Sequence, residues 1–180
     1  MTMRWMVFNV LGFQAVWWAC VLGAGEGSTW PGPLAAAVFV ALHLRFTPTP
    51  GRDLRLLTAA VLLGLLFDGL LGASGAVAYA TANEVRALAP AWILALWAGF
   101  GLTLTHSMAF FATRPVAAAL FGLVGGPLAY ASAGAVAGAA SFPQGVTIGL
   151  GAVALAWALA MPLLYAIDRR FGAVRQQAAA

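Results

Sequence analysis

The sequence predicts an all-α fold, a polytopic transmembrane bundle of six helices, and three observations lead to this class. The 180 residues are 63% hydrophobic and only 8% charged, whereas soluble domains carry about a quarter charged residues. The apolar residues form six runs separated by Pro, Gly or charged residues. The Arg residues gather in alternate connections, as in a chain that crosses a membrane repeatedly. We expect a single transmembrane domain over residues 1–180.

The six apolar segments are expected to span the membrane one after another. A helix needs about 20 residues to cross about 30 Å of hydrocarbon. The segments cover residues 4–24, 32–46, 54–74, 90–111, 115–138 and 145–167. The second is short, so it is either a short span or a re-entrant helix. The first also resembles a signal peptide, but Asn9 and Gln14 interrupt its apolar run, which favours a membrane helix.

The distribution of positive charge predicts that both ends lie in the cytoplasm. We expect the membrane to be the inner membrane of a bacterium. With the N-terminus inside, the outer connections hold one Arg, Arg86. The cytoplasmic segments hold Arg4, Arg45, Arg52, Arg55, Arg114, Arg169, Arg170 and Arg175. Short cytoplasmic loops carry such an excess of basic residues. The net charge of +4 therefore indicates contact with anionic lipid headgroups and not nucleic-acid binding.

The connections between the segments carry turn and interface signals. Pro48 and Pro50 make the second connection a stiff turn, and Arg114-Pro115 is a tight link with Pro at a helix start. The longest outer loop covers residues 75–89. Its Tyr79 and Asn83-Glu84 are expected to form a short interfacial helix.

Glycines spaced four apart indicate close helix packing. The pairs are Gly122 and Gly126, Gly134 and Gly138, and Gly145 and Gly149. Such faces can pack within the chain or form a homo-oligomer or a complex with another membrane protein. Pro127 follows Gly125-Gly126 in the middle of the fifth segment and is expected to kink it.

Asp68 is the first candidate functional residue, because ionisable side chains inside a membrane are costly. It lies about 21 Å along the third segment from the cytoplasmic side. Gly64 and Gly72 flank it at four-residue spacing, which places a close helix neighbour on that face. Asp68 is either a protonatable relay or cation ligand, or a hydrogen-bonded tie between two helices.

A second polar group is expected near the cytoplasmic end. Thr103, His106 and Ser107 are spaced i, i+3 and i+4, which would place them on one helical face. Further polar residues at similar depth are His43, Asn9, Arg114 and Asp168. These residues either converge on a pocket that holds a headgroup phosphate, a metal ion or a water, or form an interhelical hydrogen-bond patch. His106, His43 and Asp68 are the catalytic candidates, and Asn9, Thr103, Ser107 and Arg114 are the binding candidates.

No strong cofactor signal accompanies these residues. The two His residues are 63 positions apart, without an HExxH motif, so the sequence predicts no metal and no cofactor. Ser107 lacks the GxSxG context of a nucleophile. Asp68 and His106 should lie about 15 Å apart in depth, too far for a catalytic pair.

Several short runs, in this order along the chain, resemble a known family. They include Asn9, Trp18 to Gly23, Ala41-Leu42-His43, Phe67-Asp68, Trp92 to Trp97, Leu104 to Ser107, Arg114-Pro115 and Gly125-Gly126-Pro127. Together they resemble the bacterial multi-pass membrane family catalogued as domain of unknown function 2878. Thr105 is a departure, because Asn is common there in the family. The family has no assigned activity, and the resemblance implies a role in lipid handling or membrane stress.

Three functions fit these observations. The first is the handling of membrane lipids or a lipid-derived substrate in a cytoplasmic pocket at the depth of His43, His106 and Asn9. The second is a small-molecule or proton-coupled transporter that uses Asp68 and the Pro127 kink. The third is a non-catalytic subunit of a membrane complex. Whether the chain is an enzyme is left open by the sequence.

Overall fold

Six α-helices lie side by side in the structure, a computed structural model that describes residues 3–81 and 88–178, with side chains as far as Phe171. Two short β-strands and a 3-10 helix complete the described part. The α-helices are α1 (Met3–Gly25), α2 (Pro31–Phe46), α3 (Pro50–Ala73), α4 (Ala91–Gly101), α5 (Pro115–Ala137) and α6 (Val146–Ala178). The other elements are β1 (Ala78–Tyr79), η1 (Ala109–Thr113) and β2 (Ala140–Ser141). The prediction of an all-α bundle is confirmed.

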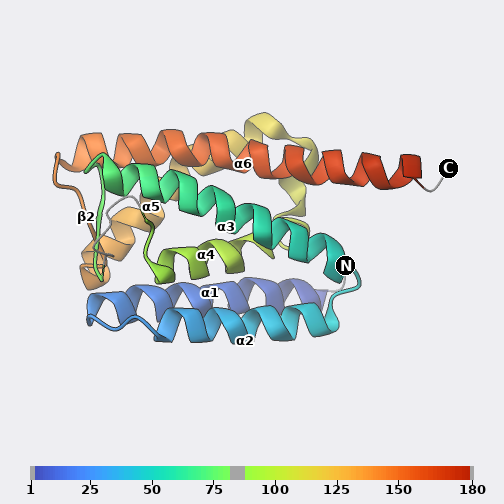
Figure 1. Ribbon diagram of the computed structural model, residues 1–180, viewed down its shortest axis with the longest axis horizontal. Coiled ribbons are helices and arrows are strands. Elements are labelled where there is room, and N and C mark those ends of the chain that lie inside the picture. Colours follow the sequence, from blue (N-terminus) through green and yellow to red (C-terminus); the bar gives the residue numbers. More distant parts are fainter. Residues whose placement is uncertain (1–2, 82–87, 179–180) are drawn as a thin grey trace.

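The helices run back and forth along the long axis, and both chain ends lie at the same end of the molecule (Figure 1). Four helical stretches are long and apolar enough to cross a membrane: Met3–Gly25, Pro50–Ala73, Pro115–Ala137 and Val146–Phe171. Helix α2 has 16 residues and α4 has 11, which correspond to about 24 and 16 Å. The count of six full spans and the orientation remain predictions.

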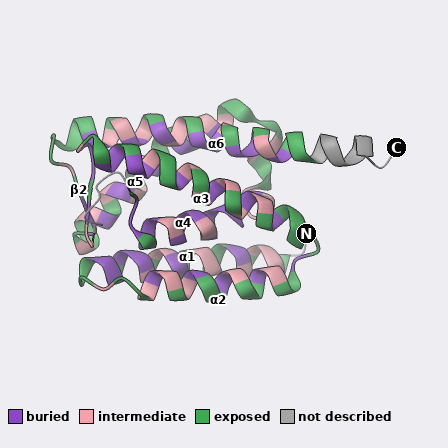
Figure 2. Cartoon of the chain, in the orientation of Figure 1, coloured by how far each residue is buried: buried purple, intermediate pink, exposed green. Residues whose placement is uncertain are grey.

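Exposed residues alternate with buried ones along the helices (Figure 2), and many of the exposed side chains are large and apolar, unlike those of a soluble protein. Large apolar side chains such as Leu155, 66% exposed, and Leu62, 60% exposed, lie on the outside. Asn9, Asp53 and Asp68 are instead buried within it. In lipid, apolar side chains face the solvent and polar ones face protein. This pattern supports a membrane protein independently of helix length.

Helix α4 ends ten residues earlier than the sequence predicts. The segment 90–111 was expected to be one helix, but α4 stops at Gly101, residues 102–108 form turns, and η1 follows. Side chains of other helices bind the backbone there. The Asn9 Nδ2 donates to the Leu102 carbonyl at 3.0 Å, and the Tyr165 hydroxyl donates to the Met108 carbonyl at 2.8 Å. Non-helical backbone is tolerated at membrane depth when protein groups satisfy it in this way.

The loop after α3 also differs from the prediction. Tyr79 was expected in an interfacial helix, but it lies in β1, which pairs antiparallel with β2 through Ala78 opposite Ser141. Asn83 and Glu84 lie outside the described residues. The Tyr79 backbone is therefore tied to the α5–α6 connection, and its side chain is directed toward Asp68.

Glycines pack helices closely within the chain. Gly122 and Gly126 of α5 both lie against Trp157 of α6. Gly138 has a φ of 64° and ends α5 in the left-handed conformation that favours glycine. Helix α5 continues through Pro127. The face formed by Gly122 and Gly126 is thus occupied by the chain's own α6, and association with another molecule through the glycine faces stays a prediction.

This packing makes a testable prediction about stability. A side chain at Gly122 would meet the Trp157 backbone carbonyl, which no change of rotamer can move away. We expect Gly122→Leu to lower the free energy of unfolding by about 3 kcal/mol. Gly151 of α6 has open space around its Cα, so Gly151→Leu is the matched control and should unfold like the wild type. Thermal unfolding in detergent measures both; equal melting temperatures would contradict the packing.

Candidate functional site

A groove of about 490 Å³ opens at the end of the bundle where α1 begins and α2 joins α3. Its lining residues come from α1, the α2–α3 connection and the turns after α4. They are Trp5, Phe46, Pro48, Thr49, Arg52, Thr105 and His106. Apolar and polar groups are therefore mixed along its wall, and His106 is the imidazole that faces it.

The carboxylate of Asp53 lies at the centre of the polar group beneath this groove. Its Oδ2 lies 3.0 Å from Nε2 of His106 and 3.2 Å from Nε2 of His43, and it accepts a 2.5 Å bond from the Thr47 hydroxyl. Its Oδ1 accepts a 3.1 Å bond from the Thr105 hydroxyl. Asp53 is fully buried, so these bonds replace the water that a buried carboxylate has lost.

The local sequence places Asp53 at this point. Pro50 begins α3, and Asp53 stands in the first turn, where the helix dipole stabilises negative charge. Its backbone N–H donates to the Thr49 carbonyl at 3.0 Å. The short connection after α2 brings Thr47 back over the same carboxylate. The stiff turn that was predicted from its prolines is thus one wall of the site.

The hydrogen-bond donors around the two imidazoles determine where their protons lie. The Trp5 indole N–H, which can only donate, lies 3.0 Å from Nδ1 of His106. Nδ1 of His106 therefore accepts, and its Nε2 carries the proton toward Asp53. Nδ1 of His43 lies 3.5 Å from the Asn9 amide nitrogen. The Asn9 oxygen accepts from the Ser107 hydroxyl at 2.5 Å, so the Asn9 nitrogen is the atom that faces His43. That nitrogen donates to Nδ1 of His43, and the proton of His43 is therefore also on Nε2.

The same donors bear on a metal ion. One ligand atom from each of His43, Asp53 and His106 lies within 4.8 Å of the others, a spacing that a metal could bridge. A metal bound at Nε2 requires the proton on Nδ1, where a hydrogen-bond acceptor normally receives it. In this site Trp5 and Asn9 present donors to the two Nδ1 atoms. The residues present therefore fit an imidazole–carboxylate pair better than a metal centre.

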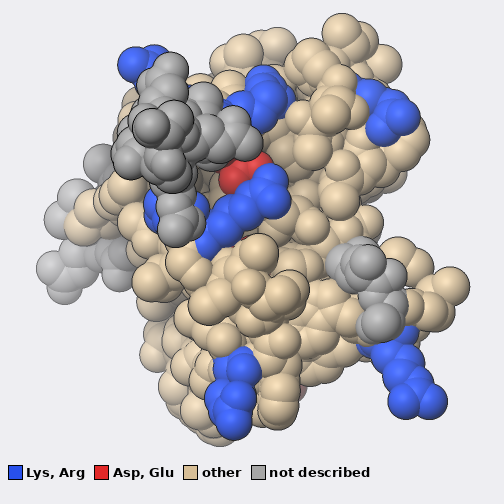
Figure 3. Space-filling view, turned by 90° about the vertical axis from the view of Figure 1, so that its right-hand side faces the viewer, with Lys and Arg blue, Asp and Glu red and all other residues tan. Residues whose placement is uncertain are grey.

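Arg side chains surround the end of the molecule that carries the groove (Figure 3). Arg52 lines the groove and holds Asp168 of α6 in a two-bond pair, with Nε at 2.8 Å and Nη2 at 2.5 Å from the carboxylate oxygens. This pair joins the start of α3 to α6. Because Asp168 is paired and Asp53 is buried, the face keeps a positive character.

The structure brings together some of the predicted residues and separates others. His43, His106, Asn9 and Ser107 meet around Asp53. Thr103 does not join them, because the helix breaks before it; its hydroxyl bonds to the Phe100 carbonyl at 2.7 Å.

Arg114 also lies away from the group. Its guanidinium bonds to the Phe110 carbonyl at 2.7 Å and covers the Phe110 ring. The prediction that Thr103, His106 and Ser107 share one helical face is wrong, because α4 ends at Gly101, before all three residues.

Asp53 and Trp5 were not among the candidate residues. Trp5 lies near the start of the first predicted segment, and Asp53 lies in the connection that was predicted to be a stiff turn. One signal was available: Asp53 is an acidic residue among the basic residues Arg52 and Arg55, with Thr47 and Thr49 just before it. Its partnership with His106, however, spans 53 positions and depends on the broken helix.

Asp68 forms a separate cluster further along α3. Trp97 Nε1 donates to its Oδ2 at 2.6 Å, and the hydroxyls of Tyr79 (2.8 Å) and Tyr130 donate to its Oδ1. Burial, with Tyr130 and Asp68 nearby, raises the pKa of Tyr79, which keeps its hydroxyl a donor. The close neighbour expected beside Gly64 is Trp97.

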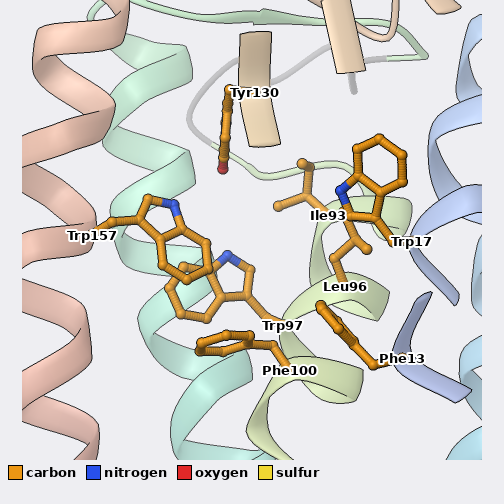
Figure 4. Close-up of a pocket in the computed structure, with 8 residues that line it drawn as sticks. All are labelled: Phe13, Trp17, Ile93, Leu96, Trp97, Phe100, Tyr130 and Trp157. Atoms are coloured by element: carbon orange, nitrogen blue, oxygen red, sulfur yellow. The ribbon is translucent and has the colours of Figure 1, made fainter. Parts of the chain in front are cut away.

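A cavity of about 50 Å³ lies beside this cluster (Figure 4). The Tyr130 hydroxyl points toward it, and the Trp97 and Trp157 rings stack at 4.5 Å along its wall. Its lining is otherwise apolar. Asp68 is fifteen residues from Asp53 on α3, which is about 22 Å. The two carboxylates therefore belong to different sites, as the sequence predicted for Asp68 and His106.

Comparison with known proteins assigns a family without an activity. The family model described as "Protein of unknown function (DUF2878)" matches residues 6–163. The match covers α1 to most of α6, including every described residue of the groove except Trp5. No curated protein and no solved structure matches the chain.

Proposed function

The chain belongs to the family of unknown function DUF2878, and from the geometry of its groove we propose that it handles membrane lipids or a lipid-derived substrate. In this proposal the substrate headgroup enters the groove, His106 acts as the general base, and Asp53 orients it. The protein lies in a bacterial inner membrane with the groove at the cytoplasmic face, as the positive charge of that end favours.

The observation that carries the proposal is the bond between Nε2 of His106 and Asp53 at 3.0 Å in a groove open to the outside. A carboxylate that holds one imidazole nitrogen as N–H leaves the other as the proton acceptor. When Nδ1 takes a proton from a substrate hydroxyl or a water, the resulting imidazolium is stabilised by Asp53. A positioned base of this kind typically contributes a factor of about 10² to 10⁴ in rate.

The surroundings of the groove support a lipid and not a water-soluble substrate. Phe46, 64% exposed, and Leu42, 44% exposed one turn before it on α2, belong to an outer surface rich in apolar side chains. Phe46 also lines the groove together with Trp5. An amphipathic molecule can thus place its headgroup beside Arg52 and His106 while its chains stay against the outer surface.

The test is native mass spectrometry of the purified protein together with the lipid composition of cells that express it. We expect His106→Gln, which can still donate to Asp53 but has no basic nitrogen, to abolish lipid conversion, that is, the change in cellular lipid composition that the wild type causes. Asp68→Asn, in the separate cluster, should retain it after correction for the amount of folded protein. If the wild type retains no lipid and changes no cellular lipid, the proposal is wrong.

The same pair of variants addresses the two other functions. A proton-coupled transporter built on Asp68 predicts pH-dependent uptake into proteoliposomes that is lost in Asp68→Asn and kept in His106→Gln. A non-catalytic subunit predicts that both variants behave like the wild type and co-purify with a fixed partner. The hydrogen bonds that occupy both oxygens of Asp68 favour a structural tie over transport.

A further inference from the structure

The basic nitrogen of His106 is covered by a neighbouring side chain. Trp5 and His106 both line the groove, and the Trp5 indole N–H donates to Nδ1 of His106 at 3.0 Å. The other ring nitrogen, Nε2, donates to Asp53. Any substrate that uses His106 as a base must therefore take the place of the Trp5 N–H at Nδ1.

This exchange restricts which chemical groups can bind there. The lone pair on Nδ1 only accepts hydrogen bonds while Nε2 carries the proton. A carbonyl, an ether or a phosphodiester oxygen would place a lone pair against a lone pair. The group that replaces Trp5 must itself be a donor: a hydroxyl, an amine or a water.

Charge at the groove distinguishes a hydroxyl from an amine. Arg52 lines the groove and has a side chain that is 45% exposed, and Arg55 lies one turn further along α3. Among the described residues of this end, Asp168 is bound by Arg52 and Asp53 is buried under its own donors. A headgroup ammonium would find no free carboxylate there, whereas a phosphate could accept from Nη1 of Arg52, because the pair with Asp168 uses only Nε and Nη2.

We propose that the substrate is an anionic phospholipid with a hydroxyl-bearing headgroup, a phosphate-linked polyol, whose hydroxyl displaces the Trp5 N–H from Nδ1 of His106. The proposal rests on the proposed function and names its substrate class. The phosphate lies toward Arg52, and the polyol reaches the imidazole. Trp5 is then a positioning residue that keeps the base occupied when no headgroup is bound.

The first test compares three lipids with identical acyl chains on the wild-type protein by native mass spectrometry. Phosphatidylglycerol carries phosphate and hydroxyls, phosphatidylethanol carries the phosphate alone, and phosphatidylethanolamine carries an ammonium. On the wild type the hydroxyl exchanges one neutral hydrogen bond for another, so phosphatidylglycerol and phosphatidylethanol should bind within about twofold of each other. Phosphatidylethanolamine should bind more weakly than both, and equal or tighter binding of it overturns the proposal. On Trp5→Phe, where no hydrogen bond is given up, phosphatidylglycerol should bind about fivefold more tightly than phosphatidylethanol, and equal binding there overturns the proposal.

The second test is Trp5→Phe, which removes the competing N–H but keeps a ring to stack on Phe8. Binding of phosphatidylglycerol should become about fivefold tighter, because no hydrogen bond has to be given up. Binding of phosphatidylethanol should stay unchanged. If Trp5 were only structural, the affinity for both lipids would fall together, and that result overturns the proposal.

The outcome for His106→Gln separates this inference from the proposed function. Loss of lipid conversion in His106→Gln, without any preference of Trp5→Phe for the hydroxyl-bearing lipid, refutes the substrate class alone. Unchanged conversion and unchanged phosphatidylglycerol binding in His106→Gln refute both.

Discussion

Replacing Asp53 with Ala is expected to destabilise the groove end of the bundle and to abolish lipid handling. The change leaves three buried donors, His43, His106 and Thr47, without their acceptor, together with the half-buried Thr105. Each unsatisfied buried group costs about 1–3 kcal/mol. Water entering from the groove beside Thr105 and His106 will offset part of this. A loss of about 3 kcal/mol or more in the free energy of unfolding remains.

Asp53→Asn separates the structural role of this residue from its chemical role. The amide oxygen can still accept from the two imidazoles, and the amide N–H₂ can donate to the Thr105 hydroxyl oxygen. Stability should therefore fall by much less than in Asp53→Ala. The neutral amide no longer stabilises an imidazolium, so lipid conversion should fall at least about a hundredfold. Thermal unfolding and lipid turnover, measured on the same two preparations, report the two roles. If Asp53→Asn keeps full conversion, Asp53 does not serve His106 in catalysis.

The second large effect is expected for Asp68→Asn, which should lower the stability of the fold because its amide group would place an N–H against the indole N–H of Trp97. Tyr79 and Tyr130 both donate to Oδ1, so the amide oxygen of Asn is drawn to that side. Its N–H₂ then faces the Trp97 indole N–H, which donates to Oδ2 in the wild type. Two donors without an acceptor cost about 1–3 kcal/mol of stability.

A double-mutant cycle tests this assignment of the two oxygens. Trp97→Phe removes the conflicting N–H, so its cost should be smaller in the Asp68→Asn background than in the wild type, with a coupling of about 1 kcal/mol or more. Tyr130→Phe is the matched comparison, because its acceptor survives in Asp68→Asn, and its cost should be similar in both backgrounds. The free energies come from unfolding in detergent. Additive effects for Trp97 would contradict the arrangement.

The candidate site was only partly predictable from the sequence. His43, His106 and Asn9 could be placed at one level, because helices have a constant rise per residue and the apolar segments are clear. Ser107 joins them, but for a different reason from the one expected. Its hydroxyl and backbone N–H reach Asn9 from a turn, not from a helical face.

The break after Gly101 could not be read from local preferences. The segment 90–111 is apolar throughout, which favours a continuous helix. Its early end depends on Asn9 and Tyr165, which come from α1 and α6 and bind the freed carbonyls. The same break carries Thr105 and His106 to Asp53, so the error about the helix and the omission of Asp53 have one cause.

The sequence by itself determined that this protein is a helical membrane protein of the family DUF2878 with polar residues in two separate layers. Composition and apolar segments are local properties of the chain, and the cost of placing charge in lipid makes them decisive. Only the tertiary structure decided that Asp53 joins His43 and His106, that Trp5 covers the basic nitrogen, and that Asp68 is held by Tyr79, Trp97 and Tyr130. Those contacts join residues 10 to 101 positions apart, and a hydrogen bond depends on positions in space that segment lengths and spacings do not contain.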